Sequence, residues 1–262
     1  MFEFHQDKEK YFDINVANVK KHILPFIEAK YPIQAGMRVL EIGCGEGGVL
    51  KAFLDLGCTG VGVELDETRL VDARKWLPKE IEQGQVQFLA KNIYFTHVEE
   101  DLGGKFNIII LKDVIEHIPD QPRLMAFMQS FLLPGGVIFL GFPPWYMPLG
   151  GHQQILKNKI LSKIPYYHLL PMPVYKRILK AAKENVQEMV EIKQTGISIE
   201  RFEKIALHTG YQVINKKHYL INPIYEYKFG WKPKTQFALV QAVPFIRNFF
   251  TTCVYYLLQK KD

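Results

Sequence analysis

Residues 37–48 read MRVLEIGCGEGG, a short apolar strand pattern that runs directly into a cluster of glycines. Helical spacing of apolar residues begins at once over 49–54 and ends near Gly57, so the glycines form a turn between a strand and a helix. Glycines at such a turn allow a tight bend and let a ligand approach the main-chain N–H groups closely. The stretch therefore predicts a ligand-binding turn in an α/β domain.

Charge indicates which ligand suits this turn. Gly43, Gly45 and Gly48 also satisfy the dinucleotide pattern GxGxxG, whose pyrophosphate would lie at the N-terminus of the helix. Glu41 and Glu46 would place two carboxylates near that phosphate, and like charges near a protein surface repel by around a few kcal/mol. A cation with an amino group and a sulfonium fits better, and S-adenosylmethionine (SAM) has both and carries no phosphate. A purely structural turn is the remaining alternative.

Strand and helix patterns alternate on both sides of the turn. A helical pattern covers about 15–30, strand patterns lie at 37–42, 59–64, 86–90, 106–111 and 136–141, and helical patterns lie at 67–76 and 123–132. A helix at 198–209, a strand at 211–221, a helical stretch at about 235–249 and a last strand at 253–258 follow. This alternation predicts a doubly wound α/β sheet with helices on both faces and ligands beyond the carboxyl ends of its strands.

The 262 residues suit one domain with additions. We divide it into an N-terminal helical segment (1–36), a cofactor-binding core (37–141), a substrate-side insertion (142–196) and the C-terminal part of the sheet (197–262), with a second insertion near 222–250. Both insertions follow strands, so the topology predicts that they overhang the binding face.

Composition excludes several classes of protein. Hydrophobic residues make up 48%, charged residues 23%, and the formal net charge is +6, which excludes a disordered or fibrous chain. Cys44, Cys58 and Cys253 form no CxxC pair, which excludes a zinc ribbon or a disulfide framework. The N-terminal sequence MFEFHQDKEKYFD is charged where a secretion signal needs an apolar run. We expect a cytoplasmic protein that binds no nucleic acid.

One stretch, 237–258, has the apolar character of a membrane segment. Gln241, Pro244 and Arg247 interrupt it, so we expect no integral membrane insertion. Basic residues at 157, 159, 163, 176, 177, 180 and 183 fit a solvated helix face, an anionic acceptor or peripheral contact with a lipid surface.

Four motifs together resemble a known family. VLEIGCGEGG, GVEL, FNIIILKDVIEHIPD and LLPGGVIFLGFP, in this order and spacing, resemble the class I SAM-dependent methyltransferases, and more distantly the ubiquinone-biosynthesis O-methyltransferases. The resemblance is strong over 37 to about 145. It implies a Rossmann-like sheet of seven strands, mostly parallel with an antiparallel last strand, and SAM as the cofactor.

The resemblance also implies roles for particular residues. Glu41 and the glycines would shape the methionine pocket, and Glu64 would hold the ribose, since a carboxylate at a strand end can accept two hydrogen bonds from ribose hydroxyls. Asn92, where many members carry an acid, is either an adenine contact or a polar turn residue. In full, the expected cofactor-binding residues are Glu41, Gly43, Cys44, Gly45, Gly47, Glu64, Leu65, Asn92, Ile93, Lys112 and Asp113.

An acceptor must be held close to the methyl group and in line with it, and a base is needed only where the acceptor must lose a proton. His117 and His152, after the fourth and fifth strands, are the candidate catalytic bases, although either could simply order a loop. Trp145 and Tyr146, in the rigid segment FPPWYMP, could form a wall against an apolar acceptor. We expect Trp145, Tyr146 and His152 to bind the acceptor.

Asp113, Glu116 and His117 would share one face if their turn is helical, and could then bind a divalent cation. The turn resembles the DxxEH-type turn of ubiquinone-biosynthesis O-methyltransferases, some of which look metal-assisted, but metal-free relatives share it. We therefore predict no metal.

The sequence thus predicts methyl transfer from SAM to a small, partly apolar acceptor, at oxygen in preference to nitrogen or carbon. Two alternatives remain. One is a nicotinamide-dependent oxidoreductase, against which Glu41 argues, and the other is a non-catalytic binding module that keeps the fold.

Overall fold

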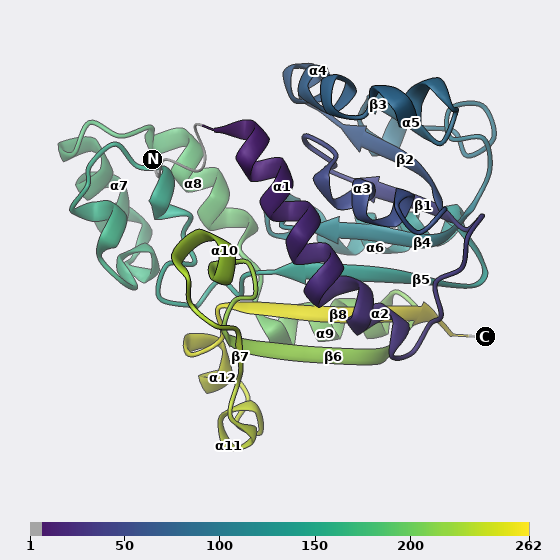
Figure 1. The fold of residues 1–262 in the computed structure, drawn as a ribbon. Coiled ribbons are helices and arrows are strands. Elements are labelled where there is room, and N and C mark those ends of the chain that lie inside the picture. Colours follow the sequence, from purple (N-terminus) through teal and green to yellow (C-terminus); the bar gives the residue numbers. More distant parts are fainter. Residues whose placement is uncertain (1–6, 262) are drawn as a thin grey trace.

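A computed structural model describes residues 7–261, so the first six residues of the N-terminal segment and Asp262 lie outside the described residues. Its centre is a sheet of strand order β3-β2-β1-β4-β5-β8-β6-β7 (Figure 1). The first five strands pair in parallel, and β8 pairs antiparallel with both β5 and β6. The strands are β1 (Arg38–Ile42), β2 (Thr59–Glu64), β3 (Val86–Ala90), β4 (Phe106–Lys112), β5 (Leu132–Phe142), β6 (Tyr211–Ile221), β7 (Lys234–Thr235) and β8 (Cys253–Lys260).

The doubly wound α/β fold is confirmed, with one strand more than the seven expected. The additional strand is the two-residue β7 in the second insertion, which pairs antiparallel with the carboxyl end of β6. The helix expected at 235–249 is broken into α11 (Ala238–Gln241) and α12 (Ile246–Phe249). Pro244 disfavours a helical conformation in the residue before it, and Phe245 follows with φ of +62°, so a continuous helix cannot form.

The N-terminal helical segment is also interrupted. It consists of α1 (Lys8–Asn18), a π-helical turn (Val19–Ile23) and α2 (Leu24–Glu28), where one helix over about 15–30 was expected. Pro25 lies in the first turn of α2, and a proline inside a continuous helix would lack an N–H donor and would clash with the preceding turn. The wider π-helical turn lies directly before the first turn of α2 and accommodates the proline there.

Helices cover both faces of the sheet, and apolar side chains alternate between two cores. One core joins α1, α2, α3 (Gly48–Leu54) and α4 (Glu67–Trp76) to side chains such as Ile108 and Ile110 of β4. The other joins α6 (Gln121–Met128) and α9 (Ile199–His208) to Ile109 and Leu111 of the same strand. The apolar run FNIIIL is therefore covered on both sides, as its sequence predicts. Helix α5 (Pro78–Glu82) follows α4.

Both insertions begin at the carboxyl ends of strands, so they lie at the same end of the sheet (Figure 1). The first follows β5 and contains α7 (Met172–Ala181) and α8 (Val186–Thr195), which pack around a small core of their own. The second follows β6 and contains α10 (Tyr225–Phe229), β7, α11 and α12. Within residues 7–261, every helix is too short or too polar to cross a bilayer.

Shortening one buried side chain of β4 tests whether the core covers both faces of the sheet. Ile109→Ala shortens a side chain with 0% exposure, and we expect it to lower the free energy of unfolding, measured in urea, by about 2–5 kcal/mol. Ile160→Ala, at a side chain that is 73% exposed, is the matched control and should change the free energy by less than about 0.5 kcal/mol. Equal effects of the two substitutions would contradict the assignment of β4 to the interior.

Candidate active site

The turn after β1 depends on glycines in backbone conformations that other residues rarely adopt. Gly43 and Gly45 have φ values of +71° and +50°. A Cβ atom at Gly43 would lie 2.6 Å from a methyl carbon of Val114, and one at Gly45 would lie 2.2 Å from the guanidinium of Arg69. The N–H of Gly43 donates to the carbonyl of Val63 at 2.7 Å, which ties the turn to β2.

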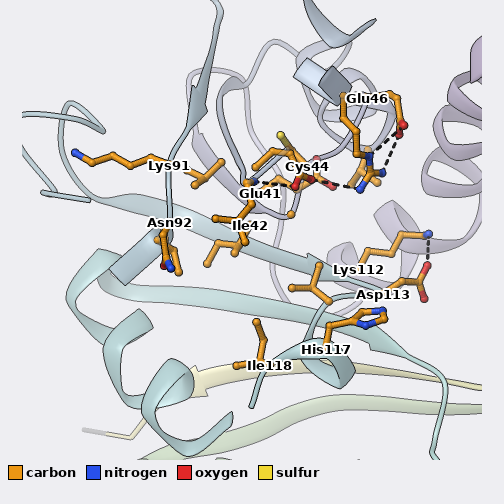
Figure 2. Close-up of a pocket in the computed structure, with 18 of the residues that line it drawn as sticks. Glu41, Ile42, Cys44, Glu46, Lys91, Asn92, Lys112, Asp113, His117 and Ile118 are labelled. Atoms are coloured by element: carbon orange, nitrogen blue, oxygen red, sulfur yellow. Dashed lines mark hydrogen bonds and ion pairs between the residues drawn. The ribbon is translucent and has the colours of Figure 1, made fainter. Parts of the chain in front are cut away.

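A cavity of about 650 Å³ lies beyond the carboxyl ends of β1, β2 and β4 (Figure 2). Its volume is typical of sites for small molecules. Helix α1 supplies Tyr11, Phe12 and Asn15 to the wall, although no sequence motif marks that helix. Of the expected cofactor-binding residues, the wall includes Glu41, Gly43, Cys44, Glu64, Leu65, Asn92, Ile93, Lys112 and Asp113, whereas Gly45 and Gly47 shape the turn behind it.

Glu41, at the end of β1, is a buried carboxyl group in this wall. It is 2% exposed, and its Oε2 atom has no hydrogen-bond partner among the described residues. Burial raises the pKa of Glu41 well above its ordinary value, against the opposing attraction of Lys112. The sequence predicts a negatively charged Glu41. In the structure, burial favours the neutral form, so Glu41 is ionised only when a cation or a hydrogen-bond donor contacts it. A donor that reaches Oε2 would satisfy that oxygen and favour the ionised carboxylate.

Lys112 ends the neighbouring strand β4. Its Nζ lies 2.7 Å from Oδ2 of Asp113, which has a φ of +57°. Burial disfavours the charged form of Lys112, but the attraction of Asp113 overrides it and raises the pKa of Lys112. Burial likewise acts against the charge of Asp113, and Lys112 overrides it and lowers the pKa of Asp113. The two residues therefore form an ion pair in the cavity wall, as Figure 2 shows.

Arg69, at the start of α4, connects two carboxylates over the glycine turn. Its Nη2 lies 3.0 Å from Oε2 of Glu46, and its Nη1 lies 3.4 Å from Oε2 of Glu64. Glu64 also accepts hydrogen bonds from the N–H groups of Gly45 at 3.0 Å and Leu65 at 2.8 Å. The contact with Arg69 is the longest of these, so a ribose hydroxyl could most readily replace it.

Asn92 and Ile93 line another part of the cavity, after β3. The side-chain oxygen of Asn92 accepts a hydrogen bond from the N–H of Tyr94 at 3.0 Å and so caps the short turn that follows. This bond leaves the amide nitrogen of Asn92 to donate to a ligand, so the two interpretations of Asn92 are compatible. Ile93 is buried, whereas Leu65, which also lines the cavity, is 73% exposed.

His117, His152 and Glu116 meet beside the cavity. The ring centroids of His117 and His152 lie 4.7 Å apart, and Nε2 of His152 lies 3.9 Å from Oε1 of Glu116. Both carboxyl oxygens of Glu116 are buried without a hydrogen-bond partner among the described residues. One ligand atom from each residue lies within 4.8 Å of the others, and such a set could hold a divalent cation. His152 takes the position in this group that the sequence pattern gives to Asp113.

The protonation states of this group follow from burial. Burial lowers the pKa of His152 to about 4. Partial desolvation also lowers the pKa of His117, which is the more exposed of the two, so both imidazoles are neutral near pH 7. Burial, together with the charge of Asp113, raises the pKa of Glu116 well above its ordinary value. His117 lines the cavity and His152 does not. Of the two candidate bases, His117 is therefore the one that a molecule in the cavity could contact.

Trp145 and Tyr146 lie outside the wall of the cavity. The carbonyl of Trp145 lies 2.8 Å from Nε2 of His168, and the two rings are 4.8 Å apart between centroids. Tyr146 is 37% exposed, and its ring lies 5.5 Å from that of Phe249. Trp145 and Tyr146 therefore do not line the cavity that the expected cofactor-binding residues form, and their contact with the acceptor stays a prediction.

Relatives of the chain share its N-terminal part. The sequence pattern described as a methyltransferase domain matches residues 12–157. A ubiquinone biosynthesis O-methyltransferase from Pseudomonas aeruginosa is 30% identical over 106 residues, which cover 40% of this chain and 44% of that protein. The chain therefore matches less than half the length of this relative.

Solved structures resemble the fold over almost the whole chain. A putative sarcosine dimethylglycine methyltransferase from Galdieria sulphuraria has a TM-score of 0.61 at 12% identity and covers 94% of this chain and 86% of its own. The plantazolicin methyltransferase BpumL, in complex with S-adenosylhomocysteine (SAH), has a TM-score of 0.57 at 11% identity and covers 97% and 84%. At such identities the likeness concerns the fold alone.

The fold, the glycine turn and the matched family agree with one another. The Glu41 carboxyl oxygen that lacks a partner in the described part of the chain, and the cavity around it, fit a ligand that carries an ammonium group, as SAM does. The family match covers more than half of the chain and includes this turn. The chain belongs to the methyltransferase-domain family, within the class I SAM-dependent methyltransferases.

Proposed function

We propose that this protein transfers the methyl group of SAM to an oxygen atom of a small, partly apolar acceptor. The observation that carries the proposal is a buried carboxyl oxygen of Glu41 that no group of the described chain contacts by a hydrogen bond, in a cavity that His117 also lines. Oxygen is favoured because His117 can accept a hydroxyl proton and because the relatives in Pseudomonas are named O-methyltransferases. Family membership favours SAM over the nicotinamide alternative.

Three residues would hold the cofactor. Glu41 would accept hydrogen bonds from the ammonium group. Glu64 would accept hydrogen bonds from ribose hydroxyls, one of which would replace Arg69. Asn92 would donate a hydrogen bond to the adenine. The wall near the turn supplies apolar surface for the acceptor through side chains that include Phe12, Ile42, Val114 and Ile118. Trp145, Tyr146 and His152 remain proposed acceptor contacts, and cytoplasmic location remains a prediction.

When bound, SAM supplies a methyl group that its sulfonium already activates, so the protein needs chiefly to align the acceptor and exclude water. The neutral imidazole of His117 accepts the proton that the acceptor hydroxyl loses as its oxygen is methylated. Asp113 stabilises the resulting imidazolium, since its charge acts to raise the pKa of His117. His152 lies behind His117 and packs against its ring. No step requires a metal.

The ribose role of Glu64 predicts a loss of cofactor affinity. Glu64→Ala should weaken SAM binding at least tenfold, which corresponds to about 1.4 kcal/mol, because two ribose hydrogen bonds disappear. Calorimetric titration measures the dissociation constant, and circular dichroism verifies the fold. Glu67→Ala, at an exposed acid of the same segment, is the matched control and should bind as the unmodified protein does. An unchanged dissociation constant in Glu64→Ala and in Glu64→Gln would contradict this role.

The raised pKa of Glu41 predicts that cofactor binding releases a proton. Glu41 binds its proton in the free protein up to a pH well above 4.5, and an ammonium partner favours the ionised form. Affinity for SAM should therefore rise with pH until the pH exceeds the pKa of Glu41 in the free protein. Titrations in two buffers of different ionisation enthalpy measure the released proton. Glu41→Gln should abolish both the proton release and the pH dependence. If both persist in this variant, Glu41 is not the partner of the ammonium group.

Turnover tests the proposed reaction directly. Radiolabelled SAM and a fractionated cell extract should yield label in a fraction of small, partly apolar molecules. His117→Ala should then lower the rate by about 10²–10⁴-fold with little change in SAM affinity. His208→Ala, at an exposed histidine of α9, is the control and should leave the rate unchanged. Cofactor binding without label transfer to any fraction would favour the non-catalytic binding module.

A further inference from the structure

Residues 231–250, which we name the finger, lie between α10 and β8 and contain β7, α11 and α12. In Figure 1 the finger extends below the sheet, and α11 lies farthest from it. Seven of the twenty exposed large apolar side chains within residues 7–261 lie in this short segment. These seven are Trp231, Phe237, Leu239, Val243, Phe245, Ile246 and Phe250.

The packing of the finger is the reverse of ordinary soluble packing, because polar side chains face inward and apolar side chains face solvent. Arg247 is 9% exposed and Asn248 0%, whereas Leu239 is 85% and Phe245 64% exposed. Nε of Arg247 lies 2.8 Å from Oε1 of Glu200 in α9, and the amide nitrogen of Asn248 donates to the other oxygen of Glu200 at 2.7 Å. These bonds fix the base of the finger and hold its apolar side chains outward.

The charge of the finger has one sign. Residues 231–250 contain no aspartate or glutamate, in a chain with 27 acidic residues. Lys232 and Lys234 are exposed, and Nζ of Lys234 lies 4.7 Å from the centroid of the Phe237 ring. Arg247, the third basic residue, is already paired with Glu200 and Glu203. The exposed surface of the finger is therefore apolar and cationic together.

Such a surface complements one class of partner in both respects. Aromatic and aliphatic side chains bury in the headgroup and upper acyl region of a bilayer, and nearby lysines attract anionic lipids. The two helices of the finger have four residues each, so the finger can enter the interface but cannot cross the membrane. Its projection from the sheet allows this contact without displacement of the core.

We propose that the finger inserts its apolar side chains into the headgroup layer of an anionic phospholipid bilayer and so binds the protein reversibly to membranes. This inference does not depend on the methyl acceptor, and its test needs neither SAM nor turnover.

Co-sedimentation of the full chain with vesicles tests the proposal. Vesicles of phosphatidylcholine with phosphatidylglycerol should bind the protein at least tenfold more tightly than vesicles of phosphatidylcholine alone. Leu239→Ser with Ile246→Ser should weaken binding to the anionic vesicles at least tenfold, because it removes apolar contact. Lys232→Glu with Lys234→Glu should abolish the preference for anionic lipid. Emission of the exposed Trp231 should shift to shorter wavelength when vesicles are added.

Matched controls lie near the opposite edge of the sheet. Val71→Ser with Ile81→Ser, at side chains 58% and 37% exposed, and Lys75→Glu with Lys79→Glu should leave vesicle binding unchanged. All substituted side chains are exposed, so thermal unfolding should verify that each variant folds. Absence of binding by the unmodified chain, or equal loss in finger and control variants, would overturn the proposal. A dimer in sedimentation velocity that the Leu239→Ser and Ile246→Ser pair dissociates, without vesicle binding, would instead assign the finger to contact between copies.

Discussion

A carboxyl group buried at the end of the central strand is the constraint on which the site depends. β1 lies between β2 and β4, so the ends of those two strands flank Glu41. Burial of a carboxylate costs several kcal/mol unless opposite charge and hydrogen bonds offset it. Lys112 on β4 offsets part of that cost, and one oxygen of Glu41 has no hydrogen-bond partner within residues 7–261. The sheet order thus creates a position that a cationic ligand would complete.

Much of the core and the cofactor side could be predicted because local patterns determine them. The strands β1, β2 and β4 are short apolar runs bounded by turn residues, and the glycines at 43, 45 and 47 need positive φ that few other residues tolerate. Strand ends in a parallel sheet meet at one edge, which is why residues from three separate motifs line one cavity. Arg69 and the contribution of Tyr11 could not be predicted, since they depend on how helices pack over that edge.

The insertions were harder to predict for a physical reason. A helical spacing of apolar residues at 235–249 normally indicates a buried face, but here Pro244 interrupts the helix and polar anchors on α9 fix the segment with its apolar side chains outward. Trp145 likewise packs on the ring of His168 within the first insertion, a contact that the sequence pattern does not indicate. In both cases a distant polar contact decides the orientation, and such contacts leave no periodic signal.

The position of Arg69 has a consequence for how tightly any nucleoside can be held. Its guanidinium occupies the space above Gly45 and contacts the same carboxylate oxygen that a ribose hydroxyl would use. If Glu64 holds the ribose as proposed, the Arg69 side chain would act as an internal competitor that is tethered to the protein. The observed affinity would then equal the intrinsic affinity multiplied by the fraction of molecules in which the Arg69 side chain has moved away from Glu64. Because this side chain is partly exposed, dissolved ions that screen its attraction to Glu46 and Glu64 would increase that fraction.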